Sequence, residues 1–156
     1  MPADAPPPLP GAVLFACNFN RVRSPMAEAL FKHFYGTRAF VDSCGLKPDH
    51  TDDGVDPFVA VVMDEMGLDV TKHKPKSFAQ LEDDSFDVVI SLTPEAQHRA
   101  VELARDRATD IEYWPTHDPT LADGSREAML TAYREVRDAL ATAIRQRFGA
   151  PSTFGG

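Results

Sequence analysis

Short runs that are apolar at every position recur along the chain and predict strands. In a parallel sheet covered on both faces, a strand reads as a continuous apolar run, without alternation between apolar and polar residues. The runs predict four strands, at Ala12–Ala16, Ala39–Ser43, Asp87–Leu92 and Ile111–Trp114.

Between these runs, apolar residues return every three or four positions, which is the spacing of one helix face. The clearest segment follows Ser24-Pro25, a pair typical of an N-cap and a first helical position, and it stops at Gly36. Asp56-Pro57 and Thr93-Pro94 open two later segments in the same way. The pattern predicts helices over residues 25–35, 57–66, 94–105 and 125–148, and a short helical turn at Ser77–Glu82.

Strands and helices therefore alternate along the whole chain. Such an order forms a parallel sheet with right-handed crossovers. We expect an α/β fold: a single domain with a four-stranded parallel sheet and helices on both faces. Ligands of such sheets bind at the carboxyl ends of the strands, and Cys17 stands at the end of the first strand, where a site is expected.

Composition indicates one domain with two flanking segments. A chain of 156 residues with 43% hydrophobic content suffices for one core. We expect residues 1–11, MPADAPPPLPG, to be a disordered proline-rich lead, residues 12–149 to form the domain, and residues 150–156 to be a loose tail.

The charge balance narrows the classes of partner. A formal net charge of −8 argues against nucleic acid and anionic membranes, so an anion site has to be a local positive feature. No apolar run approaches the ~20 residues of a membrane span. The first residues have neither the basic nor the apolar region of a secretory signal, and we expect a cytoplasmic protein.

Two cysteines, Cys17 and Cys44, are too few for a disulfide scaffold, and we expect both to be reduced. Within one strand, Cys44 points away from the face of Ser43, which favours a core-packing role. The five histidines are scattered, without metal-ligand spacing, and no metal site is expected. The acidic run at residues 49–53 is typical of a solvated loop.

The segment C-N-F-N-R-V-R-S joins the first strand to the first helix and carries the strongest chemical signal. Backbone N–H groups in such a loop converge into an anion-binding nest, and the helix N-terminus adds partial positive charge. Arg23 can place two donors on two oxygens of an oxyanion, and the field favours the Cys17 thiolate. We predict that Cys17 is a nucleophile aimed at a phosphate, and that Ser24 caps the helix and donates to the sulfur. The predicted phosphate-binding residues are Asn18, Phe19, Asn20, Arg21, Val22, Arg23 and Ser24.

The loop after the fourth strand contains His117-Asp118-Pro119, at the same edge of the sheet. A phosphate ester needs its leaving oxygen protonated as the P–O bond breaks, and a carboxylic acid on a neighbouring loop supplies that proton. We assign this role to Asp118. Two alternatives stay open: Asp-Pro also simply turns a chain, and His117 competes for the role of acid.

With these features the chain resembles the low-molecular-weight protein tyrosine phosphatases and the arsenate reductases that share their fold. The resemblance covers almost everything after residue 11 and is carried by ACNFNRVRSPMAEA, VDSCG, FDVVISL and WPTHDP. It implies a catalytic cysteine at Cys17, a phosphate-binding arginine at Arg23 and a general acid at Asp118. It also implies a phosphocysteine intermediate, no metal or organic cofactor, and a loop-supporting hydrogen-bond network. The network maps to Asn20, Ser24, Ser43 and His73.

The chain departs from the phosphatase pattern around the site. Phe19 stands where a glycine is usual, and because phenylalanine disfavours positive φ, we expect a different shape at the start of the loop. Val22 replaces a second cysteine. Thr120 and Leu121 replace tyrosines that help to wall the phosphotyrosine pocket, which puts the preference for phosphotyrosine in doubt.

The reductase branch is favoured by WPTHDP and YREVRDAL. Its thioredoxin-linked members, however, use two further cysteines near the end of the third strand. Ser91, Leu92 and Thr93 stand there, so a reductase of this kind would have to use an external thiol.

We therefore expect a phosphomonoester hydrolase of the low-molecular-weight tyrosine phosphatase type, with a phosphate monoester as substrate and a phosphotyrosine protein as one candidate. The alternatives are a single-thiol arsenate reductase and a catalytically silent module that binds phosphate or phosphoproteins. The physiological substrate and the oligomeric state do not follow from the sequence.

Overall fold

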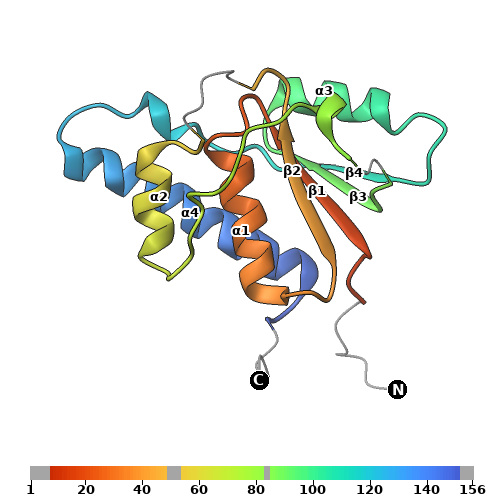
Figure 1. Ribbon diagram of the computed structural model, residues 1–156, viewed down its shortest axis with the longest axis horizontal. Coiled ribbons are helices and arrows are strands. Elements are labelled where there is room, and N and C mark those ends of the chain that lie inside the picture. Colours follow the sequence, from red (N-terminus) through yellow and green to blue (C-terminus); the bar gives the residue numbers. More distant parts are fainter. Residues whose placement is uncertain (1–7, 49–53, 83–84, 152–156) are drawn as a thin grey trace.

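The computed structural model describes residues 8–48, 54–82 and 85–151 (Figure 1). Its centre is a four-stranded sheet in the order β2-β1-β3-β4, and all three neighbouring pairs are parallel. This confirms the α/β fold that the alternating pattern predicts. The strands are β1 (Ala12–Cys17), β2 (Phe40–Gly45), β3 (Val88–Ser91) and β4 (Asp110–Tyr113).

Helices cover both faces of the sheet, as Figure 1 shows: α1, α2 and α4 lie on one side and α3 on the other. The α-helices are α1 (Arg23–Tyr35), α2 (Pro57–Asp64), α3 (Pro94–Leu103) and α4 (Arg126–Phe148). Two short 3₁₀ turns are η1 (Phe78–Gln80) and η2 (Pro119–Leu121). The first lies within the predicted turn, whereas the second stands in a segment for which the sequence predicts only a loop.

The central strand β1 contributes to two separate cores. Val13, Phe15 and Cys17 belong to the larger cluster with α1, α2 and α4. Leu14 and Ala16 belong to the smaller cluster on the α3 face. Because side chains of a strand point to opposite faces in turn, a strand with two cores has to be apolar throughout, which explains the unbroken run in the sequence.

Side-chain caps begin three of the helices where the sequence predicts them. Asp56 accepts a hydrogen bond from the N–H of Phe58 at 2.8 Å. Thr93 caps α3 and Ser125 caps α4 in the same manner. The C-terminal ends are earlier than predicted: α2 ends at residue 64 instead of 66, and α3 at residue 103 instead of 105.

The prediction that Ser24 caps the first helix is wrong. Helix α1 begins at Arg23, its N-cap residue is Val22, and no side chain caps it. The Ser24 hydroxyl is used elsewhere, since it lies 2.9 Å from the Cys17 sulfur. The side chain of this serine in the first turn thus contacts the sulfur of Cys17 and does not cap its own helix.

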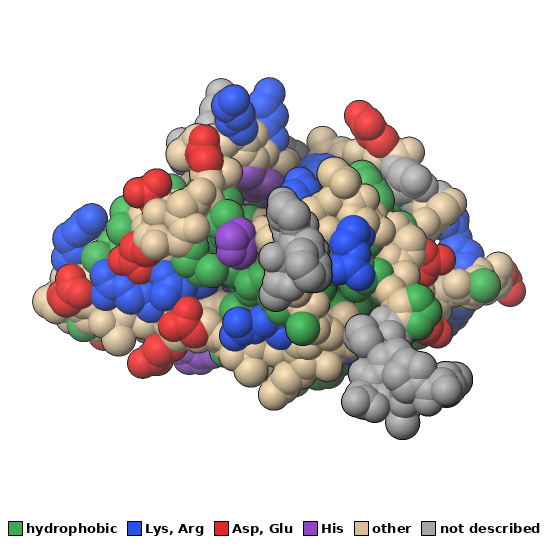
Figure 2. All heavy atoms as spheres, turned by 90° about the horizontal axis from the view of Figure 1, so that it is seen from below, with side chains coloured by type: hydrophobic (Ala, Val, Ile, Leu, Met, Phe, Trp, Pro, Cys, Tyr) green, Lys and Arg blue, Asp and Glu red, His purple; other side chains and the backbone are tan. Residues whose placement is uncertain are grey.

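The flanking segments and the charged surface complete the fold. Leu9, in the predicted lead, packs against the larger core. Residues 1–7, the acidic run at 49–53 and the tail at 152–156 lie outside the described residues. Figure 2 shows cationic and acidic side chains interspersed on one face. Glu65, at the end of α2, forms ion pairs with Arg134 and Arg137 of α4. Among the described helices, none has the length and apolar character of a membrane span.

Candidate active site

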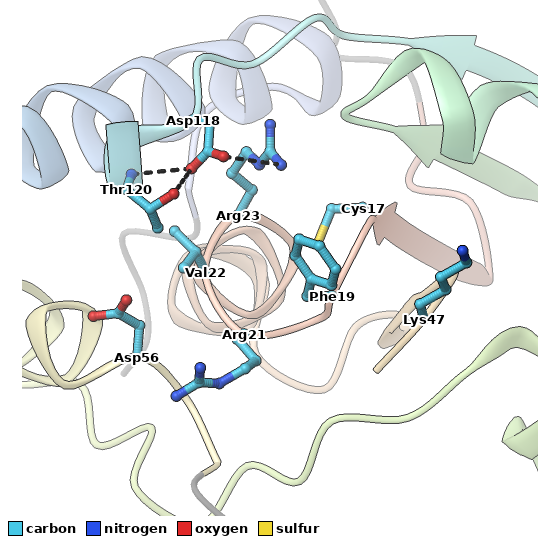
Figure 3. Close-up of a pocket in the computed structure, with 9 residues that line it drawn as sticks. All are labelled: Cys17, Phe19, Arg21, Val22, Arg23, Lys47, Asp56, Asp118 and Thr120. Carbon is cyan, nitrogen blue, oxygen red and sulfur yellow. Dashed lines mark hydrogen bonds and ion pairs between the residues drawn. The ribbon is translucent and has the colours of Figure 1, made fainter. Parts of the chain in front are cut away.

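A cavity of about 340 Å³ opens at the carboxyl end of β1 (Figure 3). Its walls come from the loop after β1, from the segment after β2, from the start of α2 and from the loop after β4. Cys17, Arg23 and Asp118 all line it, although they are far apart in the sequence. The full lining is Cys17, Phe19, Arg21, Val22, Arg23, Lys47, Asp56, Asp118 and Thr120.

Cys17 is the last residue of β1 and only 2% of it is exposed. Its Sγ lies 2.9 Å from Ser24 Oγ, and the Ser24 hydroxyl is also 3.3 Å from the carbonyl of Cys44. A thiol can donate to Ser24 while Ser24 donates to that carbonyl. A hydroxyl can also donate, so Ser24 can be a hydrogen-bond partner for either a thiol or a thiolate.

Asn20 holds the loop in shape from inside. It has φ +57°, in the left-handed region that asparagine tolerates better than most residues. The side chain is fully buried, and its Nδ2 donates to Ser24 Oγ at 2.8 Å and to Ser43 Oγ at 3.0 Å. Its Oδ1 accepts from the N–H of Lys76 at 3.0 Å. Every polar atom of the amide group is used, which fixes the rotamer.

His73 supports the same residue from the other side, with Nε2 at 2.9 Å from the carbonyl oxygen of Asn20. Since a carbonyl only accepts, Nε2 carries a hydrogen. Burial lowers the pKa of His73, which favours the neutral ring with its proton on Nε2. Ser43 in turn donates to Glu28 at 2.6 Å. The structure thus brings together the predicted support residues Asn20, Ser24, Ser43 and His73.

Phe19 needs no strained backbone, because the left-handed residue of the loop is its neighbour Asn20. Gly45 makes room for this part of the loop. A Cβ at Gly45 would lie 2.8 Å from Asn20 N, 2.9 Å from Asn18 O and 2.9 Å from the carbonyl carbon of Phe19.

Arg23 and Asp118 meet at one wall of the cavity, as Figure 3 shows. One guanidinium nitrogen of Arg23 donates to the carbonyl of Thr116 at 3.1 Å, and another lies 4.0 Å from Asp118 Oδ2. Asp118 Oδ1 accepts from both the N–H and the hydroxyl of Thr120, at 3.0 and 2.7 Å. One carboxylate oxygen is therefore held by the turn, and the other lies beside the arginine.

His117 does not line this cavity. It lines a separate groove with Trp114 and residues of α4. Consecutive side chains of the loop thus point to different places, and the geometry favours Asp118 over its neighbour as the acid. The turn that Asp-Pro was expected to favour is present as well, so Asp118 combines a structural contact with a position at the cavity.

Three residues near the cavity were not assigned to the site from the sequence. Asp56 lines it and, besides capping α2, accepts a hydrogen bond from the Tyr133 hydroxyl of α4 at 3.0 Å. Burial and the charge of Asp56 raise the pKa of Tyr133, so the hydroxyl stays a donor. Lys47 also lines the cavity, and its N–H donates to Asn18 O at 2.9 Å. The pair Asp56-Pro57 indicated the start of a helix in the sequence, but nothing in the sequence pattern indicated that Asp56 lines the site.

Cys44 lies on the opposite face of the sheet. It is fully buried in the smaller core, whereas Cys17 belongs to the larger one. Burial raises the pKa of Cys44, which keeps it a neutral thiol.

At the end of β3, the Thr93 hydroxyl donates to Asn18 Oδ1 at 2.7 Å. Within the described residues, no group of three or more His, Cys, Asp or Glu side chains is placed to hold a metal ion.

A family model described as low molecular weight phosphotyrosine protein phosphatase matches residues 12–150. The chain belongs to this family. Among its relatives, the glutaredoxin arsenate reductase of Synechocystis is 31% identical over 135 residues, which cover 85% of this chain and 95% of that protein. This relative agrees with the resemblance to a superfamily that includes arsenate reductases.

Solved structures of this superfamily share the fold. The tyrosine phosphatase AmsI of Erwinia amylovora superposes with a TM-score of 0.73 at 19% identity, covering 92% of this chain and 95% of that one. An arsenate reductase in its phosphate-binding state gives a TM-score of 0.65 at 28% identity, covering 86% of this chain and 97% of that one. Members with different activities therefore share one scaffold, and the fold alone does not choose between them.

Proposed function

We propose that this protein is a phosphomonoester hydrolase that works through a phosphocysteine on Cys17. The observation that carries the proposal is the meeting of Cys17, Arg23 and Asp118 on one cavity. A nucleophile, a cation for an oxyanion and a carboxyl group are the parts that hydrolysis by this route needs. A 28% identical relative, solved as an arsenate reductase in the phosphate binding state, supports binding of phosphate compounds by this protein.

In the first step, the Cys17 thiolate attacks phosphorus and the bond from phosphorus to the leaving oxygen breaks. Arg23 and the N–H groups of the loop hold the charge on the other phosphate oxygens. Asp118, in its protonated form, gives its proton to the leaving oxygen. The Ser24 hydroxyl, 2.9 Å from the sulfur, stabilises the thiolate before the attack and again when it leaves.

In the second step, a water molecule attacks the phosphocysteine. Asp118 is now the carboxylate and takes a proton from that water, so the acid of the first step is the base of the second. The sulfur–phosphorus bond breaks, and inorganic phosphate and the Cys17 thiolate are released. Residues of this chain account for every proton, and no external reductant enters the cycle.

The test measures hydrolysis of aryl phosphates whose leaving groups differ in pKa. Cys17→Ser should abolish turnover. Asp118→Asn should lower it on the order of 10²–10⁴-fold for poor leaving groups and much less for good ones, because only poor leaving groups need a proton. His117→Gln is the matched control on the next residue, and its turnover should stay at the wild-type level.

Two results would contradict the proposal. An equal loss of turnover for good and poor leaving groups in Asp118→Asn would mean that Asp118 has only a structural role, through its contact with Thr120. Absence of turnover in the wild-type protein, together with protection of Cys17 by phosphate against alkylation, would favour the silent binding module.

A second candidate function is reduction of arsenate by a single thiol of this chain, which the 31% identity to a glutaredoxin arsenate reductase supports. Arsenate would bind Cys17, and external thiols would supply the two electrons and end as a disulfide. Cys44 is buried on the other face of the sheet, which argues against a route that uses two thiols of this chain. Arsenate-dependent NADPH oxidation should therefore be absent with thioredoxin and its reductase alone. Activity with glutathione and glutaredoxin would establish this candidate.

A further inference from the structure

The Phe19 ring is unusual within the loop that holds Cys17. Of residues 17–24 it alone is exposed, with 53% of its surface accessible, while its neighbours are buried or half-buried. No other aromatic ring of the described residues packs against it. A large apolar side chain at such a place loses the benefit of burial unless something else covers it.

The Phe19 ring lines the same cavity as Cys17, as Figure 3 shows. Most of the remaining lining is polar or charged, namely Arg21, Arg23, Lys47, Asp56, Asp118 and Thr120. The aliphatic Val22 packs against the larger core. Phe19 is therefore the main apolar wall, and its flat face is suited to another flat apolar group.

A phosphate group does not need an apolar contact, because under the proposed function Arg23 and the loop N–H groups bind its oxygens. What extends beyond the phosphate is the ester's leaving group. With the phosphate on Cys17, such a group would leave the bottom of the cavity between its lining residues, and Phe19 is one of them.

We propose that Phe19 determines substrate specificity: its ring packs against the leaving group and selects aryl phosphates over alkyl phosphates. This inference rests on the proposed function, because it names the class of ester at the same site. Phe19 touches the substrate from the phosphate-binding loop itself, so the wall and the oxyanion site are fixed by one short segment.

Binding of phosphonates tests the wall without any chemical step. Phenylphosphonate and methylphosphonate carry the same anionic head, and inorganic phosphate carries no substituent. By calorimetry with the reduced wild-type protein, phenylphosphonate should bind about tenfold tighter than methylphosphonate, in line with the strength of a ring contact. Phe19→Ala should remove this preference, whereas Phe19→Tyr should keep it.

Phe40→Ala is the matched control. Phe40 is also half exposed, at 50%, but it begins β2 at the opposite end of the strand from the cavity. Its replacement should leave all three affinities unchanged.

Hydrolysis separates the inference from the proposed function. In Phe19→Ala, the ratio of kcat/KM for an aryl phosphate to kcat/KM for an alkyl phosphate should fall about tenfold. A Phe19-dependent preference for phenylphosphonate, without hydrolysis of any ester, would refute the proposed function and leave the wall intact. An unchanged preference in Phe19→Ala would refute the role of Phe19 in specificity. An equal loss of affinity for phenylphosphonate and inorganic phosphate would refute it too, because Phe19 would then only shape the loop.

Discussion

At the scale of single residues, Gly45 sets how closely the phosphate-binding loop lies against β2. A Cβ at this position would come within 2.9 Å of backbone atoms of the loop, and backbone cannot move aside as a flexible side chain can. Gly45→Ala should therefore push the loop outward. We expect a loss of about 1–3 kcal/mol in the free energy of unfolding and a drop in phosphate affinity on the order of tenfold. Denaturant unfolding and calorimetric titration measure the two effects.

The same replacement at Gly11 provides the control. A Cβ there meets only the carboxylate of Asp87, at 3.1 Å, and a side chain can turn away. Gly11→Ala should keep the wild-type affinity for phosphate. If Gly45→Ala also kept it, the close approach of loop and strand would not matter for the site.

At the scale of elements, one hydrogen bond connects two helices at the cavity. The Tyr133 hydroxyl of α4 donates to Asp56, which begins α2 and lines the cavity. Tyr133→Phe removes the donor and leaves a carboxylate oxygen without its partner. We expect a loss of about 1–2 kcal/mol in the free energy of unfolding and a three- to tenfold loss in kcat/KM for an aryl phosphate.

Tyr35→Phe is the counterpart at the other end of α4, where the Tyr35 hydroxyl donates to Gly149 O at 2.7 Å. This change should cost about 1 kcal/mol of stability and leave the kinetics unchanged. Equal kinetic losses in both variants would mean that general loosening of α4, and not the position of Asp56, lowers the activity.

At the scale of the whole molecule, the sheet separates the two thiols. Cys17 faces α1, α2 and α4, and Cys44 is buried with α3 on the other face. A disulfide would require one strand to turn over, so an oxidised Cys17 has no partner within the chain. Prolonged peroxide should carry it past sulfenic acid to forms that dithiothreitol does not reduce, with lasting loss of turnover.

Mass spectrometry of the peroxide-treated protein distinguishes the outcomes. We expect sulfinic and sulfonic Cys17, and the same products in Cys44→Ala. Full recovery of the wild-type protein with dithiothreitol, lost in Cys44→Ala, would demonstrate a disulfide across the sheet and refute the separation of the thiols.

The sequence by itself determined the elements and the nucleophilic loop. Apolar runs and helical spacing are local patterns, and local burial requirements produce them, so the strands, the helices and the caps at Asp56 and Thr93 could be predicted. Cys17 and Arg23 lie in one short segment whose conformation follows from a strand that ends and a helix that begins. The expected position of Asp118 at the same sheet edge also follows, because all parallel strands end at that edge.

Only the tertiary structure decided which side chains share the cavity. Asp56 carried a helix-start signal, but its contact with Tyr133 spans 77 positions of sequence. Ser24 was predicted to cap a helix, but its hydroxyl contacts the Cys17 sulfur and the Asn20 amide instead. Phe19 carried a departure from a pattern, but only the folded loop shows that its ring is exposed and lines the cavity. These contacts come from packing between segments that are distant in the sequence. A polar side chain there has several possible partners, and the local sequence pattern does not say which of them it will contact.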